Sequence, residues 1–172
     1  MILNNYWKMR WAIETLITVS SSEPYGIDVG LKDLGGVNRA ITLRPYPNTN
    51  VGNTYQRIVR MDSNYNIRLG SGDNELTADD YALTNDVTSS FTNLTYNYVS
   101  DANNHLRRVI SISGQNNTNT DITITEIAYI KKLPYDDATR SCEVMYSIVK
   151  LDTPINVPAN GTFSATVEWV EQ

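Results

Sequence analysis

The chain has 172 residues, which is the length of one ordinary domain with room for an appended arm. Its formal net charge of −5 excludes the basic surface that nucleic-acid binding requires. It also lacks a run of about 18 apolar residues, the length that crosses a membrane as a helix. We therefore expect neither nucleic acid nor a membrane among its partners.

Chemically versatile side chains are scarce, since His105 is the only histidine and Cys142 the only cysteine. These residue types supply most nucleophiles, general bases and transition-metal ligands. The sequence therefore predicts a protein that is not an enzyme, with no catalytic residues, no cofactor and no metal site. One cysteine cannot form an internal disulfide bond, and the N-terminus lacks a signal-peptide pattern, so we expect synthesis in a reducing cytoplasm.

Residues 6–19 fit two periodicities. With period two, Trp7 and Trp11 share one face of a strand, whereas with the helical period Tyr6 begins an apolar stripe. We favour a short helix capped by an asparagine of the Asn4-Asn5 pair. The simplest role of the two tryptophans is to anchor the segment in the core, and an aromatic platform for a ligand is the alternative.

About 50 residues are Asn, Thr or Ser, an excess over average usage that suits strands with one polar face. Nine segments are read as strands: 27–31, 40–44, 55–61, 67–69, 91–99, 106–113, 121–130, 144–151 and 163–169. Glycines mark the structural turns at Gly70, Gly72 and Gly161. The sequence predicts a mainly β fold, an antiparallel β-sandwich of jelly-roll or immunoglobulin-like type, with an arm or helix over 1–22 and a single domain over 23–172.

Two acidic groups could carry chemistry. Residues 73–80 concentrate oxygen ligands that could hold calcium, but their spacing is not that of a twelve-residue calcium loop. We favour Asp79 and Asp80 as caps of a short helical turn. A carboxylate pair for glycoside hydrolysis would need Glu126 with a second acid, either Asp121 or Glu143. We favour the simpler interpretation that Glu126 pairs with a base or faces water.

Opposite charges are segregated along the chain, with arginines between positions 39 and 68 and acids between 73 and 86. They could pair across a sheet, face water, or form complementary patches on neighbouring subunits. We interpret them as a subunit interface together with the aromatic N-terminus, so the candidate interface residues are Tyr6, Trp7, Trp11, Arg57, Arg60, Arg68, Asp79 and Asp80.

Four stretches resemble segments of tailed-bacteriophage virion proteins. The first two are Ile67-Arg68-Leu69-Gly70-Ser71-Gly72-Asp73 and Leu76-Thr77-Ala78-Asp79-Asp80-Tyr81-Ala82-Leu83, similar to a strand that ends in Gly-x-Gly before a polar loop. The third is Asp121-Ile122-Thr123-Ile124-Thr125-Glu126-Ile127-Ala128, and the fourth is the hairpin-like Pro154-Ile155-Asn156-Val157-Pro158-Ala159-Asn160-Gly161-Thr162-Phe163. The likeness covers 65–172 and, more weakly, the Asn4-Asn5-Tyr6-Trp7 start.

The resemblance implies a non-enzymatic structural protein of the virion, docked on capsid, neck or tail through contacts between oligomers. Its implied partners are other virion proteins and further copies of itself, and its implied location is the virion after synthesis in the host cytoplasm. The alternative is a carbohydrate-binding module or receptor-binding adhesin domain, which would take a glycan on exposed aromatic side chains.

Overall fold

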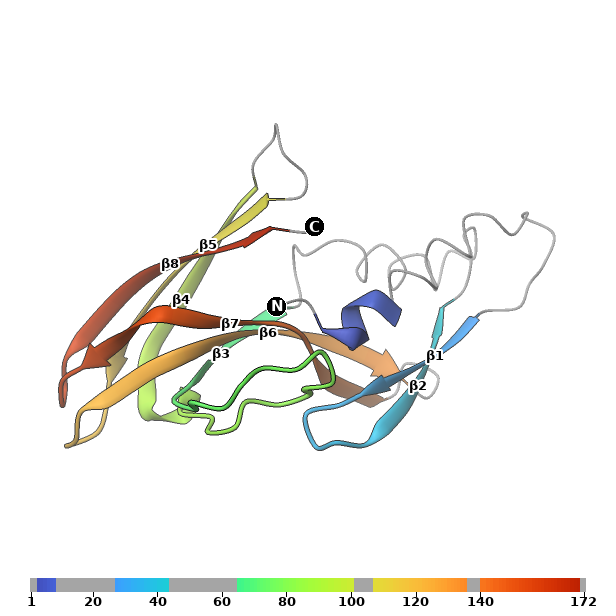
Figure 1. Cartoon of the computed structure of the whole chain (residues 1–172), viewed down its shortest axis with the longest axis horizontal. Helices are drawn as coiled ribbons and strands as arrows, with labels where there is room; N and C mark the ends of the chain where they lie inside the picture. The colour runs from blue at the N-terminus through green and yellow to red at the C-terminus, as the bar shows by residue number, and fades with distance from the viewer. Residues whose placement is uncertain (1–2, 9–26, 44–64, 101–106, 136–139, 171–172) are drawn as a thin grey trace. The chain divides into compact units, whose positions relative to one another are not determined.

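The computed structural model describes residues 3–8, 27–43, 65–100, 107–135 and 140–170 (Figure 1). A short helix covers residues 4–8, and one 3-10 turn covers Thr88–Ser90. The strands are β1 Ile27–Lys32, β2 Asn38–Leu43, β3 Tyr65–Gly70, β4 Phe91–Ser100, β5 Arg107–Asn116, β6 Ile122–Tyr135, β7 Arg140–Val157 and β8 Thr162–Val170. The predicted mainly β, antiparallel fold is therefore confirmed. The predicted strand over 55–61 lies outside the described residues.

The chain folds into two compact units. Unit 1 consists of Met1–Asn66, Thr77–Ala82 and Tyr129–Ser147, and unit 2 of Ile67–Leu76, Leu83–Ala128 and Ile148–Gln172. Strands β6 and β7 are long enough to contribute residues to both. The predicted boundary between residues 22 and 23 falls outside the described part of the chain, so that division stays a prediction.

Unit 1 contains the hairpin of β1 and β2, paired antiparallel from Ile27 opposite Leu43 to Lys32 opposite Asn38. Its apolar side chains alternate with polar ones, as a strand with one covered face requires. The buried members are Val29, Leu31 and Ile41 from the hairpin, together with Tyr129 and Tyr146 from the unit 1 parts of β6 and β7. The hairpin therefore has a packed face and an exposed face.

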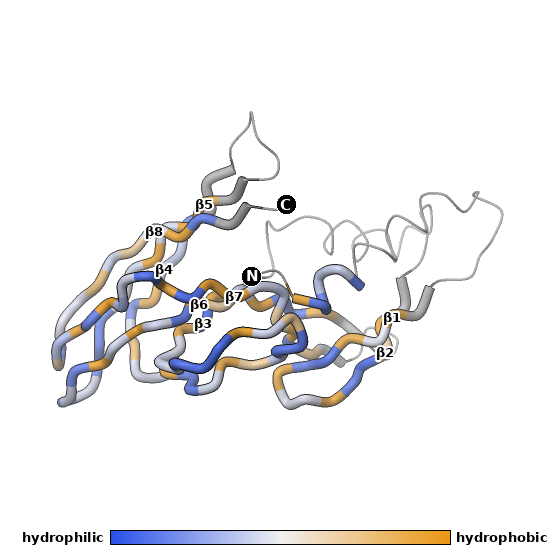
Figure 2. The backbone as a smooth tube through the Cα atoms, in the orientation of Figure 1, coloured by the Kyte–Doolittle hydropathy of each residue, from blue (hydrophilic) through white to orange (hydrophobic). Residues whose placement is uncertain are grey.

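Unit 2 contains a three-stranded antiparallel sheet in the order β4-β5-β8. Ile110 and Ile112 of β5 and Phe163 and Val167 of β8 are buried, whereas Ser164 and Thr166 of β8 are exposed and polar. The alternation along these strands can be followed in Figure 2. A hydroxyl-rich outer face and an apolar inner face are thus built into the period-two pattern.

The second sheet has the strand order β3-β6-β7. The residues of this sheet that belong to unit 2 form the other layer of that unit (Figure 1). The arrangement of unit 2 is sandwich-like, as expected. Every residue of β6 from Glu126 to Lys131 is buried, so both faces of the strand are covered there. This explains why the alternating pattern disappears from the sequence at Glu126-Ile127.

Gly114 is a local departure from the sequence prediction. The sequence predicted a strand that ends at residue 113, but β5 continues to Asn116 and Gly114 is buried opposite Phe163. A Cβ added to Gly114 would lie 3.0 Å from Cε1 of Phe163. The Phe163 ring also packs edge-on against Phe91, with the ring centroids 5.3 Å apart. Gly114 therefore makes room for an aromatic pair.

Candidate functional site

The N-terminal segment, defined here as residues 3–8, is fixed to unit 1 by main-chain hydrogen bonds. Leu3 is fully buried, and its N–H donates to the carbonyl oxygen of Tyr146 over 2.9 Å. The N–H of Asn4 donates to Ala78, also over 2.9 Å, and the Asn4 side chain donates to Asp79 over 2.8 Å. The segment is therefore anchored at its start by both main-chain and side-chain bonds.

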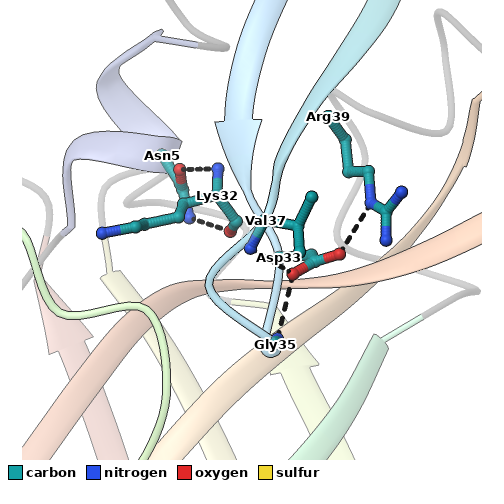
Figure 3. Close-up of polar contacts among 6 residues, drawn as sticks. All are labelled: Asn5, Lys32, Asp33, Gly35, Val37 and Arg39. Atoms are coloured by element: carbon teal, nitrogen blue, oxygen red, sulfur yellow. Dashed lines mark hydrogen bonds and ion pairs between the residues drawn. The ribbon is translucent and has the colours of Figure 1, made fainter.

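Asn5 joins this segment to two strands, β1 and β7. Figure 3 shows its bonds to Lys32 of β1. Its Nδ2 donates to the carbonyl oxygen of Lys32 over 2.9 Å and to that of Met145 over 3.3 Å. Its Oδ1 accepts the N–H of Lys32 over 3.0 Å. The side chain is buried, so these bonds satisfy main-chain groups that would otherwise lose water without compensation. The sequence placed Asn4 or Asn5 at the helix cap, whereas both side chains bond outside the helix.

Tyr6 and Trp7 form an aromatic pair on this anchored helix. Their ring centroids lie 5.4 Å apart with the planes nearly perpendicular, and Tyr6 also contacts Tyr146 edge-on at 6.1 Å. Tyr6 is half-buried, whereas Trp7 is 40% exposed. Trp7 is therefore not a fully buried anchor. It is a partly exposed aromatic side chain on a backbone that hydrogen bonds hold in place. Trp11 lies outside the described residues.

The turn that closes the hairpin of unit 1 is organised by Asp33 (Figure 3). Its Oδ1 accepts the N–H groups of Gly35 and Val37, each over 2.9 Å, and its Oδ2 accepts Nε of Arg39 over 2.7 Å. Burial acts to raise the pKa of Asp33, but these donors and the Arg39 charge outweigh it and lower the pKa below its usual value. The carboxylate is thus held ionised as part of the turn.

The predicted caps Asp79 and Asp80 lie in an ordered turn of unit 1. Asp80 accepts the N–H of Thr77 over 2.9 Å and its hydroxyl over 3.0 Å, while Asp79 accepts Asn4. Residues 78–79 form a turn and not a helix, and Asp80 bonds back to Thr77 three residues before it, so Asp80 closes this turn and does not cap a helix. Within the described residues, no group of three or more His, Cys, Asp or Glu side chains is arranged to hold a metal ion.

A lysine fixes the acidic stretch of unit 2. Nζ of Lys150 donates to the carbonyl oxygens of Asp73 and Asn74 over 2.6 and 2.7 Å. A cationic ammonium group therefore binds the carbonyl pair of the same loop in which the sequence suggested oxygen ligands for calcium. This contact orders the loop that follows the Gly-Ser-Gly turn.

Arg68 bonds within unit 2, since its Nη1 lies 2.7 Å from Oδ2 of Asp86 and both side chains are 33% exposed. Burial acts to raise the pKa of Asp86, but bonds from Thr88 and Arg68 outweigh it and lower the pKa below its usual value. Arg57 and Arg60, the other predicted interface arginines, lie outside the described residues. The role of this group at an interface stays a prediction.

Gly70 and Gly72 lie against the side chain of Glu126, which is fully buried. A Cβ on Gly70 would meet Oε2 of Glu126 at 2.9 Å, and one on Gly72 would meet Cβ of Thr84 at 2.9 Å and Oε2 of Glu126 at 3.2 Å. The two glycines are therefore required by close approach, as the sequence suggested. Of the two alternatives that we favoured for Glu126, its burial excludes the one in which it faces water.

The turn at Gly161 is held by Asn116, a residue that the sequence did not single out. Asn116 is fully buried, and its Nδ2 donates to carbonyl oxygens of Thr120, Val157 and Pro158. Its Oδ1 accepts the N–H and hydroxyl of Thr118 over 2.9 and 2.7 Å. One amide thus satisfies two connections of unit 2. The Asn-x-Thr spacing is the local signal that could have identified it.

The other groups considered for catalysis each have a separate structural environment. Cys142 is buried, and burial, with the nearby Asp33 charge, raises the pKa of its thiol. Asp121 accepts the N–H of Ala159 over 2.9 Å, and Glu143 accepts the side chain of Asn66 over 3.2 Å. The acids proposed as partners of Glu126 are thus each bonded to other groups. His105 lies outside the described residues.

Comparison with known proteins identifies no relative. No protein-family model, no curated protein and no solved structure matches the chain. No helix among the described residues is both long and apolar enough to span a membrane. Arguments about function therefore depend on the residues and their geometry.

Proposed function

We propose that this chain is a non-enzymatic structural protein of a tailed-bacteriophage virion, which docks on capsid, neck or tail through oligomeric protein–protein contacts. Its partners are other virion proteins and further copies of itself, and its location is the virion after synthesis in the host cytoplasm. The resemblance of 65–172 to segments of such proteins suggests the class.

The observation that carries the proposal is the use of polar side chains to hold loops and turns. Asn116, Asp33 and Lys150 bond main-chain atoms of connecting segments. Asn5 bonds the main chain of β1 and β7 and so holds the N-terminal segment. Such bonds fix the surface of a small β protein in one conformation, which reduces the entropy lost when it binds a partner. A fixed surface with hydroxyl-rich strands suits a platform on which other polypeptides assemble.

The N-terminal segment is the favoured docking element. Trp7 is exposed, and tryptophan and tyrosine contribute most of the binding energy in many protein interfaces. Because Leu3 and Asn5 fix the backbone on which Trp7 stands, little ordering remains to be done on binding. Trp7→Ala should therefore weaken docking while leaving the fold intact, since the side chain is not part of the buried core.

The decisive test is mass spectrometry of virus particles purified from a sample that carries this sequence. We expect the chain at a fixed copy number relative to the capsid protein, and a Trp7→Ala chain should be depleted from particles. Thr123→Ala, a change at an exposed residue of β6 in unit 2, serves as the control for docking by the N-terminal segment. Absence of the chain from intact particles would refute the proposal.

The second candidate is a carbohydrate-binding module or receptor-binding adhesin domain. The exposure of Trp7 favours it, because sugars stack on exposed aromatic rings. A glycan array probed with the whole chain and with Trp7→Ala distinguishes the two functions. A glycan signal that disappears in Trp7→Ala supports the adhesin, whereas docking to particles without glycan binding supports the structural protein.

A further inference from the structure

The outer strands of a sheet carry main-chain N–H and C=O groups that are not bonded within that sheet. Natural proteins cover such edges or guard them with bulges, charges or proline, because an open edge pairs readily with another chain. Unit 2 holds residues of four outer strands, namely β4 and β8 of one sheet and β3 and β7 of the other. These four edges differ in how far they are covered or guarded against pairing with another chain.

The edge of β3 is covered by the segment that follows the acidic loop. The N–H of Val87 donates to the carbonyl oxygen of Leu69 over 2.9 Å, and the N–H of Leu69 donates to Oγ1 of Thr88 over 2.8 Å. Beyond the strand, the N–H of Ser71 donates to Asn85 over 3.0 Å. The N–H and C=O groups of Leu69 at this edge are therefore in use.

Two further edges are guarded. The unit 2 part of β7 carries the exposed residues Lys150, Asp152 and Pro154, which are the charged and proline residues that disfavour strand addition. Strand β4 shifts register between Thr92 and Thr95, and Asn93 within this bulge has a φ of 53°. A bulge twists an edge and breaks its regular row of donors and acceptors.

Strand β8 has the fewest of these guards. It pairs with β5 from Arg107 opposite Val170 to Gln115 opposite Thr162 without a register shift. It contains no proline, and Glu168 is its one charged residue. No strand of the described residues pairs with its other side. Its regular backbone is therefore the open edge of unit 2 within the described part of the chain.

We propose that β8 pairs antiparallel with β8 of a second copy, about a two-fold axis at Ala165. This inference rests on the proposed function, because it names a surface through which copies of the chain associate. In this register Phe163 of one copy lies opposite Val167 of the other, so the apolar inner faces of the two sheets become continuous. On the outer face, Ser164 of one copy lies opposite Thr166 of the other.

The charges favour a second copy of β8 as the occupant. Each Glu168 lies opposite Thr162 of the other copy, so the two carboxylates are separated by six residues of strand, or about 20 Å. Pairing β8 with β4 of another copy would instead meet the bulge at Asn93 and would repeat head to tail. Self-pairing gives a closed dimer, bonds the main-chain N–H and C=O groups at the outer edge of β8, and keeps like charges apart.

Cysteine cross-linking of the full chain tests the register. Facing residues of an antiparallel pair lie about 4.5–5.5 Å apart at Cα, within the range that a disulfide bond spans. We expect Ala165→Cys to form a covalent dimer on mild oxidation, and Thr95→Cys on the guarded β4 edge to stay monomeric. The native Cys142 is buried, so the unchanged chain is the background control. Failure of Ser164→Cys, Ala165→Cys and Thr166→Cys alike to cross-link would overturn the proposal.

Sedimentation velocity tests the association itself. The double variant Ser164→Glu and Thr166→Glu places carboxylates opposite one another across the proposed ladder, and both side chains are exposed, so the fold should persist. We expect this variant to be monomeric where the unchanged chain dimerises, and the matched β4 variant Thr95→Glu and Asn97→Glu to dimerise normally. Circular dichroism checks that both variants remain folded.

The outcomes separate this proposal from the proposed function. A chain that is monomeric at every concentration, or that forms rings, overturns pairing through β8. Neither result bears on the proposed virion function, which mass spectrometry of particles tests. A dimer that cross-links through Ala165→Cys in a chain absent from particles supports the pairing and refutes the virion function. A dimer that dissociates as salt rises from about 0.1 M to about 1 M would show that ion pairs hold it, and would also overturn the proposal.

Discussion

Units 1 and 2 each depend on one buried asparagine, but the two side chains reach their partners differently. Asn5 bonds Lys32 and Met145, which are 27 and 140 residues away. Asn116 bonds two residues of its own loop, 2 and 4 positions on, as well as the 157–158 backbone, 41 and 42 positions on. Asn116 can therefore order its loop before the tertiary contacts form, whereas Asn5 orders nothing until both partners are in place.

The two asparagines therefore stabilise different parts of the molecule. Asn116 fixes connections that belong to the sheet of unit 2, so its loss should weaken that unit. Asn5 holds the N-terminal segment, so its loss should release the segment and its exposed Trp7 while the strands of unit 1 remain. Local bonding supports the fold, and long-range bonding supports the candidate docking element.

Replacing the asparagines gives the largest expected effects. Asn116→Ala should lower the free energy of unfolding by about 4 kcal/mol, because several buried main-chain groups lose their partner at once. Asn5→Ala should lower it by about 2 kcal/mol, because fewer bonds are lost. Chemical denaturation measures both, and hydrogen exchange should localise the Asn5→Ala effect to the N-terminal segment. Equal losses spread over both units would contradict the comparison.

The glycines provide the next test. Gly72→Ala in unit 2 should cost about 2 kcal/mol, because its Cβ would lie 2.9 Å from Cβ of Thr84, and overpacking forces neighbours to move. Gly30→Ala in unit 1 is the matched control, since a Cβ there would have nothing within 4 Å. It should be neutral or stabilise by up to about 1 kcal/mol through the unfolded chain. Thermal unfolding of both variants decides the matter, and similar losses would show that close approach is not the cause.

The aspartates give the smallest expected effects, at acid pH. The pKa values of Asp33 and Asp86 lie below their usual value in the folded chain. Each carboxylate therefore stabilises the fold fully above its unfolded pKa of about 3.9, and this stabilisation is lost as the pH falls through the lower folded pKa. Asp33→Asn should cost about 1 kcal/mol at neutral pH and Asp86→Asn less, because the Asp86 pair is more exposed.

Denaturation from pH 7 to pH 2 measures the aspartate effects. The difference between each variant and the unchanged chain should shrink below about pH 4, because protonation removes the same charge that the substitution removes. About 1 M salt should reduce the Asp86 effect more than that of the buried Asp33. A difference that is constant with pH would show that the charges are not responsible.

The sequence predicted those parts of the fold that period-two patterns and turn residues specify locally. Ile110 and Ile112 of β5 and Phe163 and Val167 of β8 alternate with polar residues, and they are buried as expected. Prediction failed where the pattern depends on distant contacts. Gly114 lies beyond the strand predicted over 106–113, and only the Phe163 ring packed against it explains why a glycine continues β5.

The candidate site could be predicted only in outline for the same reason. The sequence suggested Tyr6 and Trp7 as aromatic features, but the degree to which each is exposed depends on what packs against it. Asn5 and Lys150 gave no sequence signal for their roles, since each bonds main-chain atoms 27 or more residues away. Side chains that act over such distances are recognised only when the chain is folded.

By itself, therefore, the amino-acid sequence determined the strand class, the antiparallel sheets and the close turns at Gly70 and Gly72. Alternation, glycine and asparagine chemistry act over a few residues, where sequence neighbours are also neighbours in space. Only the tertiary structure decided that Glu126 is buried, that Trp7 is exposed, and that no strand of the described residues pairs with the outer edge of β8. Burial and edge position are properties of what the rest of the chain places beside a residue, and that is set by contacts between distant segments.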